Sequence, residues 1–435
     1  MSETILPLAM AGLTLGAILL GYKVGMVLAG SAALFILVSD LPIAFFNLLV
    51  SRIYANVLSN WLLVAIPMFI FMGLILEVSG VAERSLRAAQ KALGGSAAGM
   101  GVSVLVVGVM LAASSGIVGA SVVLLALLAL PRLLEAGYDK QTTAGLVTAS
   151  GTLAILIPPS VMLIILGDQL QTPVPSMFAG AIGPGLLLVL VYAAFVIWRS
   201  RGLPRITGYE RASPLMVLLD LGPLIGLVVA VLGSIIAGIA TPTEASGLGA
   251  FGAVLITALY GRFSLATLMD AARKTVITTS TVLFLMIGAT CFSAVFKAVG
   301  GDDLVEAGIM AFGDGPYVVL AVVMMFIFLL GFVLDWLEIT LILMPIFAPV
   351  ISGLDFGNGL SGDALLIWFG ILVAVNLQTS FLTPPFGFSL FYLRGAIGDR
   401  LSTPEIYGGV VPFIALQLLV LALLIVFPGL ITGLI

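Results

Sequence analysis

The chain has 435 residues, of which 61% are hydrophobic and only 9% charged, and its formal net charge is −4. A soluble protein of this length could not hide that much apolar surface in one core, so the composition indicates an integral membrane protein. The single Cys291 excludes an internal disulfide, and the absence of histidine excludes His-based catalysis, His proton relays and His metal ligands. We therefore expect no catalytic residues and no nucleic-acid partner.

Apolar runs long enough to cross a hydrocarbon layer of about 30 Å as helices recur along the chain. They predict an all-α protein of two halves, 1–198 and 215–435, joined by a linker at 199–214. In the first half we expect scaffold helices within 1–80, an interfacial helix at 81–93, a re-entrant hairpin at 96–131, a broken helix at 141–167 and a helix at 176–198. In the second half we expect helices within 216–261, an interfacial helix at 263–273, a helix at 274–297, a re-entrant hairpin at 316–350, a broken helix at 364–394 and a helix at 405–433.

The distribution of basic residues predicts how the halves are oriented. The linker stretch RSRGLPRITGYER carries four arginines against one glutamate, which places it in the cytoplasm and the N-terminus in the periplasm. If both hairpins enter and leave on one side, only Arg52 and Lys297 of the seventeen basic residues fall on the outer side. Each half then has five crossings plus one hairpin. Because five is odd, the second half is inverted relative to the first, which is a transporter architecture.

Two pairs of consecutive prolines interrupt the predicted broken helices. Pro158 and Pro159 form the first pair, and Pro384 and Pro385 follow 226 positions later. Proline removes a backbone donor and clashes with the preceding turn, so each pair should unwind its helix. Unwound backbone at membrane depth is tolerated where it is buried in protein or lines a polar cavity, and its oxygens suit a small cation such as Na⁺. The alternative is a kink that only shapes the bundle.

The turns of the two hairpins carry the other candidate residues. The first turn, LAASSGIVGASVV, offers small residues whose half-helix amides suit an anionic substrate. The second, FVLDWLEITLILMP, contains Asp335 and Glu338, the most deeply placed acids, which are functional candidates by depth. The alternative is that these carboxylates bond to backbone amides in a wet hairpin tip.

A charged residue follows each second proline after nine positions, Asp168 in the first half and Arg394 in the second. The predicted topology places them at opposite membrane faces, as an inverted repeat requires. Arg394 could bind a substrate carboxylate through two hydrogen bonds. The alternative is a helix-end cation anchored at the cytoplasmic interface.

Four motifs resemble the large membrane subunit of tripartite ATP-independent periplasmic (TRAP) transporters, and the resemblance covers essentially the whole chain. They are MLAASSGIVGASVVLLALLALPRLLEAGYDK, ASGTLAILIPPSVMLIILGDQL, GFVLDWLEITLILMPIFAPVI and NLQTSFLTPPFGFSLFYLRGAIG. Common dicarboxylate-type members carry a Ser-Gly-Ser…Asp pattern at the first hairpin, where this chain has Ile117 and Ser121 in place of the second serine and the aspartate. The chain is more similar to the branch labelled mannitol/chloroaromatic compound or 2-oxo acid type.

The resemblance implies an elevator-type secondary transporter of the bacterial inner membrane that is driven by a Na⁺ gradient, without an organic cofactor. It implies that a periplasmic binding protein delivers an organic acid anion, and that a small subunit of about four helices pairs with this one among the membrane lipids. Carried over to this sequence, the Na⁺ ligands are Ser114, Ser115, Gly116, Gly151 and Thr152 at one site and Asp335, Thr379, Ser380 and Thr383 at the other. The substrate is expected between the two tips, near Ser115, Gly116, Asp335, Gln378 and Arg394.

Two other functions remain open at this point. A stand-alone Na⁺/carboxylate or anion carrier of similar design would need no binding protein. A membrane-embedded enzyme is suggested only by the stretch DDLVE at 302–306, which lacks a second acidic cluster at the same face.

Overall fold

The computed structural model describes residues 2–116, 118–204, 213–357 and 359–435. Every regular element in these ranges is a helix, and eight of the helices are long and apolar enough to cross a membrane. Helices satisfy their backbone hydrogen bonds internally, which a spanning segment in hydrocarbon requires. The prediction of an all-α membrane protein is therefore confirmed.

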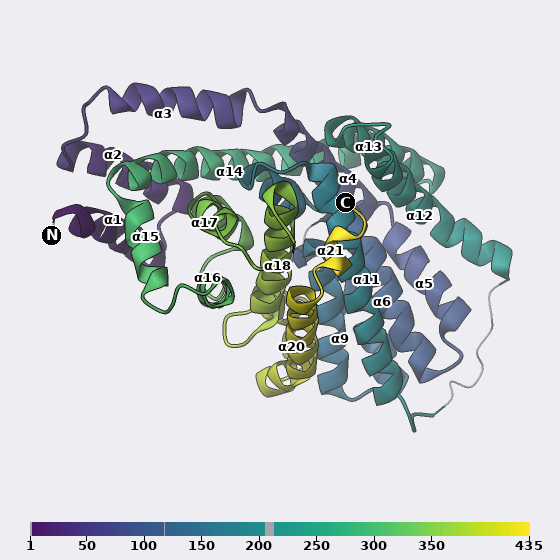
Figure 1. Ribbon diagram of the computed structural model, residues 1–435. Helices are drawn as coiled ribbons and strands as arrows, with labels where there is room; N and C mark the ends of the chain where they lie inside the picture. The colour runs from purple at the N-terminus through teal and green to yellow at the C-terminus, as the bar shows by residue number, and fades with distance from the viewer. Residues whose placement is uncertain (1, 117, 205–212, 358) are drawn as a thin grey trace.

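The helices form two groups, and the first lies along the upper and outer edges of Figure 1. We call it the peripheral group. It comprises α1 (Ser2–Leu19), α2 (Val24–Val38), α3 (Phe45–Ile53), a π-helical turn η1 (Tyr54–Leu58), a 3₁₀ turn η2 (Trp61–Val64), α4 (Ala65–Val78), α12 (Pro214–Ile236), α13 (Pro242–Leu259), α14 (Leu265–Ala298) and α15 (Gly301–Met310). Helix α14 packs along α2 and α13 packs along α4. A Cβ built on Gly288 of α14 would lie 2.5 Å from the carbonyl oxygen of Gly25, so only glycine permits this close approach.

The second group, which we call the central group, contains both interrupted helices. It comprises α6 (Ala97–Ser115), α7 (Val118–Leu128), α8 (Leu130–Glu135), α9 (Lys140–Thr152), η3 (Leu153–Ile155), α10 (Val161–Gln169), α11 (Val174–Arg199), α16 (Pro316–Leu330), α17 (Trp336–Ser352), α18 (Gly362–Leu382), α19 (Phe388–Ile397), η4 (Gly398–Arg400), α20 (Thr403–Val426) and α21 (Gly429–Thr432). Helix α18 lies at the centre of this group, and 94% of its most apolar 18-residue stretch is buried. The corresponding stretch of α12 is only 11% buried. Peripheral helix faces are thus left for lipid or another membrane subunit.

The amphipathic helix α5 (Val81–Leu93) connects the groups and packs against α6 and α12. One expected boundary differs from that observed. Residues 263–273 and 274–297 do not form separate helices, because α14 continues from Leu265 to Ala298 without a break. Within the region 1–80, α2 and α3 are separate helices, since Ser39–Ala44 leave the helix around Pro42.

Candidate functional site

The first interrupted helix unwinds at Pro158 and Pro159 and is sealed inside the protein. Helix α9 ends at Thr152, α10 begins at Val161, and both prolines are buried. The Ser160 hydroxyl donates a 2.7 Å hydrogen bond to the Ile155 carbonyl, which the missing proline donors leave without a helical partner. The break is thus stabilised by a side chain that lies immediately beyond it.

The second interrupted helix repeats this arrangement with one difference. Between the end of α18 at Leu382 and the start of α19 at Phe388, Pro385 and Phe386 are exposed. The Ser389 hydroxyl donates a 2.6 Å bond to the Phe381 carbonyl, as Ser160 does in the first half. The Tyr407 hydroxyl donates to the Pro385 carbonyl over 3.1 Å. The second break is therefore buried at its ends, at Leu382 and Gly387, and exposed in between, at Pro385 and Phe386.

The two interrupted helices meet through a pair of side chains at matching positions. Gln378 Nε2 donates to Thr152 Oγ1 over 3.4 Å, and both residues are 0% exposed. Each residue lies six positions before its own proline pair. The Gln378 Oε1 atom is also buried and has no hydrogen-bond partner among the described residues. The bond thus joins the two interrupted helices directly.

Each hairpin tip lies against the interrupted helix of its own half. Gly116, which ends α6 in a left-handed conformation (φ 59°), would place a Cβ 3.9 Å from the Pro159 carbonyl oxygen. Gly331, which follows α16, would place a Cβ 2.2 Å from Ser380 Oγ. The structure thus brings Gly116 to the first break and the second tip to α18. The side chain of Ser115 and residue Ile117 lie outside the part of the chain that the structure describes.

The remaining hydroxyls predicted to bind Na⁺ share one orientation. Each donates its proton to a helix carbonyl three or four residues earlier, at distances of 2.7 to 3.1 Å, in Ser114, Thr152, Thr379, Ser380 and Thr383. A hydroxyl that donates in this way keeps acceptor lone pairs for a cation. Gly151 packs against Val122, where a Cβ would approach to 2.4 Å, so it can offer only its carbonyl.

Asp335 and Glu338 form a capping box at the start of α17. The Asp335 carboxylate accepts from the Trp336 amide at 2.8 Å, and Glu338 accepts from the Asp335 amide at 3.2 Å. This is the backbone-bonded arrangement that the sequence left as the alternative. Ion binding by Asp335 would use the carboxylate oxygen that does not accept the hydrogen bond from the Trp336 amide. This binding stays a prediction.

Arg394 lies in the last turn of α19. It is exposed and donates to the hydroxyl of Thr403, where α20 begins. This placement agrees with the alternative of a helix-end cation, and substrate binding by Arg394 stays a prediction.

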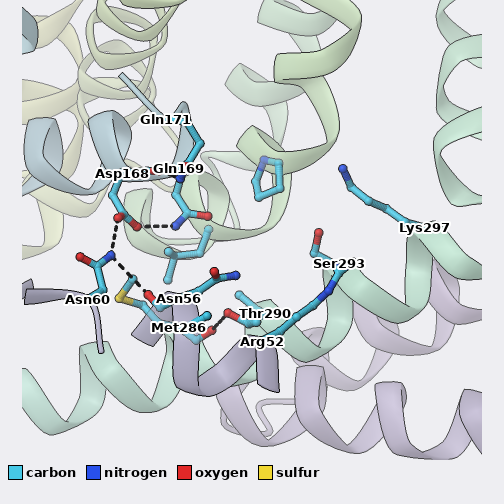
Figure 2. Close-up of a pocket in the computed structure, with 14 residues that line it drawn as sticks. Arg52, Asn56, Asn60, Asp168, Gln169, Gln171, Met286, Thr290, Ser293 and Lys297 are labelled. Carbon is cyan, nitrogen blue, oxygen red and sulfur yellow. Dashed lines mark hydrogen bonds between the residues drawn. The ribbon is translucent and has the colours of Figure 1, made fainter. Parts of the chain in front are cut away.

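A polar cavity that the sequence did not predict lies between the two groups of helices (Figure 2). Its volume is about 430 Å³. Arg52 and Asn56 line it from α3 and η1, Lys297 from α14, and Asp168 and Gln171 from the end of α10 and the turn after it. Asn60 Nδ2 donates to Asp168 Oδ1 at 2.6 Å and so connects the peripheral and central walls. The one signal in the sequence was that Arg52 and Lys297 fall on the outer side.

The fold as a whole is similar to that of a solved membrane protein. The Alcanivorax borkumensis YdaH transporter superposes with a TM-score of 0.64 over 99% of this chain and 98% of its own, at 15% identity. At that identity the likeness shows the fold alone.

A family model described as "Tripartite ATP-independent periplasmic transporter, DctM component" matches residues 11–430. The chain is 31% identical over 373 residues to the Ruegeria pomeroyi ectoine/5-hydroxyectoine TRAP transporter large permease protein UehC, covering 84% of both chains. It is 27% identical over 431 residues to the Escherichia coli 2,3-diketo-L-gulonate TRAP transporter large permease protein YiaN, covering 97% of this chain and 96% of the relative. The chain therefore belongs to the DctM family of TRAP transporter large permeases. It is an integral inner-membrane transporter subunit and not an enzyme.

The capping box predicts that substitutions of Asp335 separate a structural from an ionic role. Asp335→Ala should lower the free energy of unfolding by about 0.5–2 kcal/mol, whereas Asp335→Asn should leave it nearly unchanged, because asparagine also caps helices. Thermal denaturation in detergent and transport assays would be run on both variants. If Asp335→Asn keeps its stability and loses transport, the charge itself is required.

A matched control is Thr241→Ala, which removes the cap of the same kind at the start of α13. It should cost similar stability and leave transport intact. Full transport by a stable Asp335→Asn protein would show that Asp335 serves only as a cap.

Proposed function

We propose that this protein imports an organic acid anion across the inner membrane by Na⁺-coupled secondary transport. The observation that carries the proposal is the meeting of two interrupted helices at the Thr152–Gln378 bond, with one hairpin tip at the first break and the other against α18. Broken helices that meet near mid-membrane supply carbonyls, hydroxyls and half-helix ends, which are the groups that bind ions and substrate in secondary transporters. The printed family description, which calls the transporter ATP-independent, agrees with an ion gradient as the energy source.

The coupling ions would be held where each tip contacts its break. In the first half the oxygens come from Ser114, Gly116, Gly151 and Thr152, together with Ser115. In the second half they come from Thr379, Ser380 and Thr383, with Asp335 across the tip. Carbonyl and hydroxyl oxygens in this number suit a hard monovalent cation, and the hydroxyl protons already point into the helices.

The substrate would lie between the two tips, beside Gln378. Gln378 Oε1 has no partner among the described residues and is an acceptor, and the amide end of α7 favours negative charge. One relative is named for 2,3-diketo-L-gulonate, which supports an organic acid, in particular one of the 2-oxo type.

Transport would proceed by movement of the central group against the peripheral group, in an elevator motion. The halves would be inverted repeats, with the N-terminus in the periplasm. The word "tripartite" in the family description supports a small membrane subunit of about four helices and a periplasmic binding protein as partners. The exposed apolar surface of α12 is available to the small subunit or to lipid.

Uptake in proteoliposomes tests the energy source. With the two partner proteins present, uptake of the organic acid should require an inward Na⁺ gradient and should stop when choline replaces Na⁺. Uptake driven by a pH gradient and indifferent to Na⁺ would refute Na⁺ coupling. Uptake that persists without the binding protein would instead favour a stand-alone carrier.

Removal of one hydroxyl ligand should weaken Na⁺ binding. Thr383→Ala is expected to raise the Na⁺ concentration for half-maximal uptake about tenfold, since a hydrogen bond or similar contact to a charged group contributes about 1.5–3 kcal/mol. The control is Thr281→Ala on α14, whose hydroxyl makes the same kind of bond to the Ile277 carbonyl at 3.0 Å and is exposed. An unchanged Na⁺ response in Thr383→Ala would exclude the Thr383 hydroxyl as a ligand at the second break.

A further inference from the structure

The polar cavity of Figure 2 lies apart from the hairpin tips, at the boundary between the peripheral and central groups. Its volume of about 430 Å³ is within the range of small-molecule sites. Its walls carry charged and amide side chains from segments far apart in the sequence. The cavity therefore has both the size and the polarity to hold a small organic ion.

The charges on its walls favour an anion. Asp168 is the one acid among the described residues that line the cavity, against the two cations Arg52 and Lys297. The Asp168 carboxylate already accepts from two neutral amides, Asn60 at 2.6 Å and Gln169 at 3.0 Å, as Figure 2 shows. The Asp168 carboxylate is thus held by neutral amides, and it forms no ion pair with Arg52 or Lys297 among the described residues.

Neither Lys297 nor Arg52 forms a strong ion pair with an acidic side chain among the described residues. Lys297 Nζ lies 3.7 Å from Asp302 Oδ2 in a pair that is partly exposed on both sides, which contributes little. Arg52 is exposed and has no ion pair among the described residues. Both cations remain available for a ligand that enters the cavity.

The sequence singles out the same two residues independently. Under the predicted topology fifteen of the seventeen basic residues face the cytoplasm, and the two exceptions are Arg52 and Lys297. Although they are far apart in the chain, the fold places both on the walls of one cavity. Positive charge concentrated in an outer cleft raises the local concentration of anions.

We propose that this cavity is a receiving site for the organic anion, in which Arg52 and Lys297 bind its carboxylate before it reaches the hairpin tips. Asn56, Gln171 and Ser293 line the same space and offer amide and hydroxyl groups to the rest of the molecule. The inference rests on the proposed function, because it assigns the point at which the same substrate enters.

A labelling experiment tests occupancy without transport. In a Cys291→Ser background, Ala55→Cys places a thiol on the cavity wall, and Leu58→Cys places one on the same turn but outside the lining. A membrane-impermeant maleimide is added from the outside to the complex in liposomes, with and without 2-oxobutyrate. We expect 2-oxobutyrate to slow labelling of Ala55→Cys at least threefold and to leave Leu58→Cys unchanged. Equal labelling of Ala55→Cys with and without the anion, or no labelling from outside, would overturn the proposal.

Transport kinetics give the second readout. Arg52→Gln and Lys297→Gln should each raise the apparent KM for the anion at least fivefold and leave the half-saturating Na⁺ concentration unchanged, and Arg52→Lys should restore part of the loss. Arg400→Gln, on the exposed turn η4, is the control and should behave as wild type. Unchanged KM values in both cavity variants would overturn the proposal. A wild-type protein whose uptake ignores Na⁺ would instead overturn the proposed coupling, and the labelling result would still stand by itself.

Discussion

The structure depends on one constraint, namely that backbone freed from a helix inside a membrane must find partners within the protein. Each proline pair removes helical hydrogen bonds at a depth where water cannot replace them. A serine just past each break, Ser160 or Ser389, donates a hydrogen bond from its hydroxyl to a backbone carbonyl on the other side of the break. The chain also packs one hairpin tip against the first break and the other against α18. Breaks secured in this way present oxygens at fixed positions, which an ion site needs.

The same constraint explains the division of the chain into two groups of helices. The interrupted helices cannot face lipid, so helices α6, α11, α17 and α20 pack around them, and α18 is almost wholly buried. The peripheral helices are continuous and can expose apolar faces to lipid or to a partner. Between the groups, polar side chains from both walls meet in the cavity near Asn60 and Asp168.

Features that depend on neighbouring residues could be predicted from the sequence, whereas features that depend on contacts between distant segments could not. The interruptions at Pro158 and Pro384 were predictable, because proline acts on its own helix whatever surrounds it. The Thr152–Gln378 bond was not, since it joins positions 226 residues apart and depends on tertiary packing. The depth of Asp335 suggested ion binding, but its spacing from Glu338 is also that of a capping box, and the structure shows the cap. The cavity could not be predicted from the sequence, because its walls come from four separate segments.

The central claim is that the two interrupted helices and their hairpin tips hold the coupling ions. A high-resolution structure of the complete complex, determined once in Na⁺ and once in choline, tests it most directly. We expect ion density beside Thr379, Ser380 and Thr383 and beside Ser114 and Thr152 in Na⁺, and its loss in choline. Ion density elsewhere in the protein, with both breaks empty in Na⁺, would show that the coupling ions bind at another place.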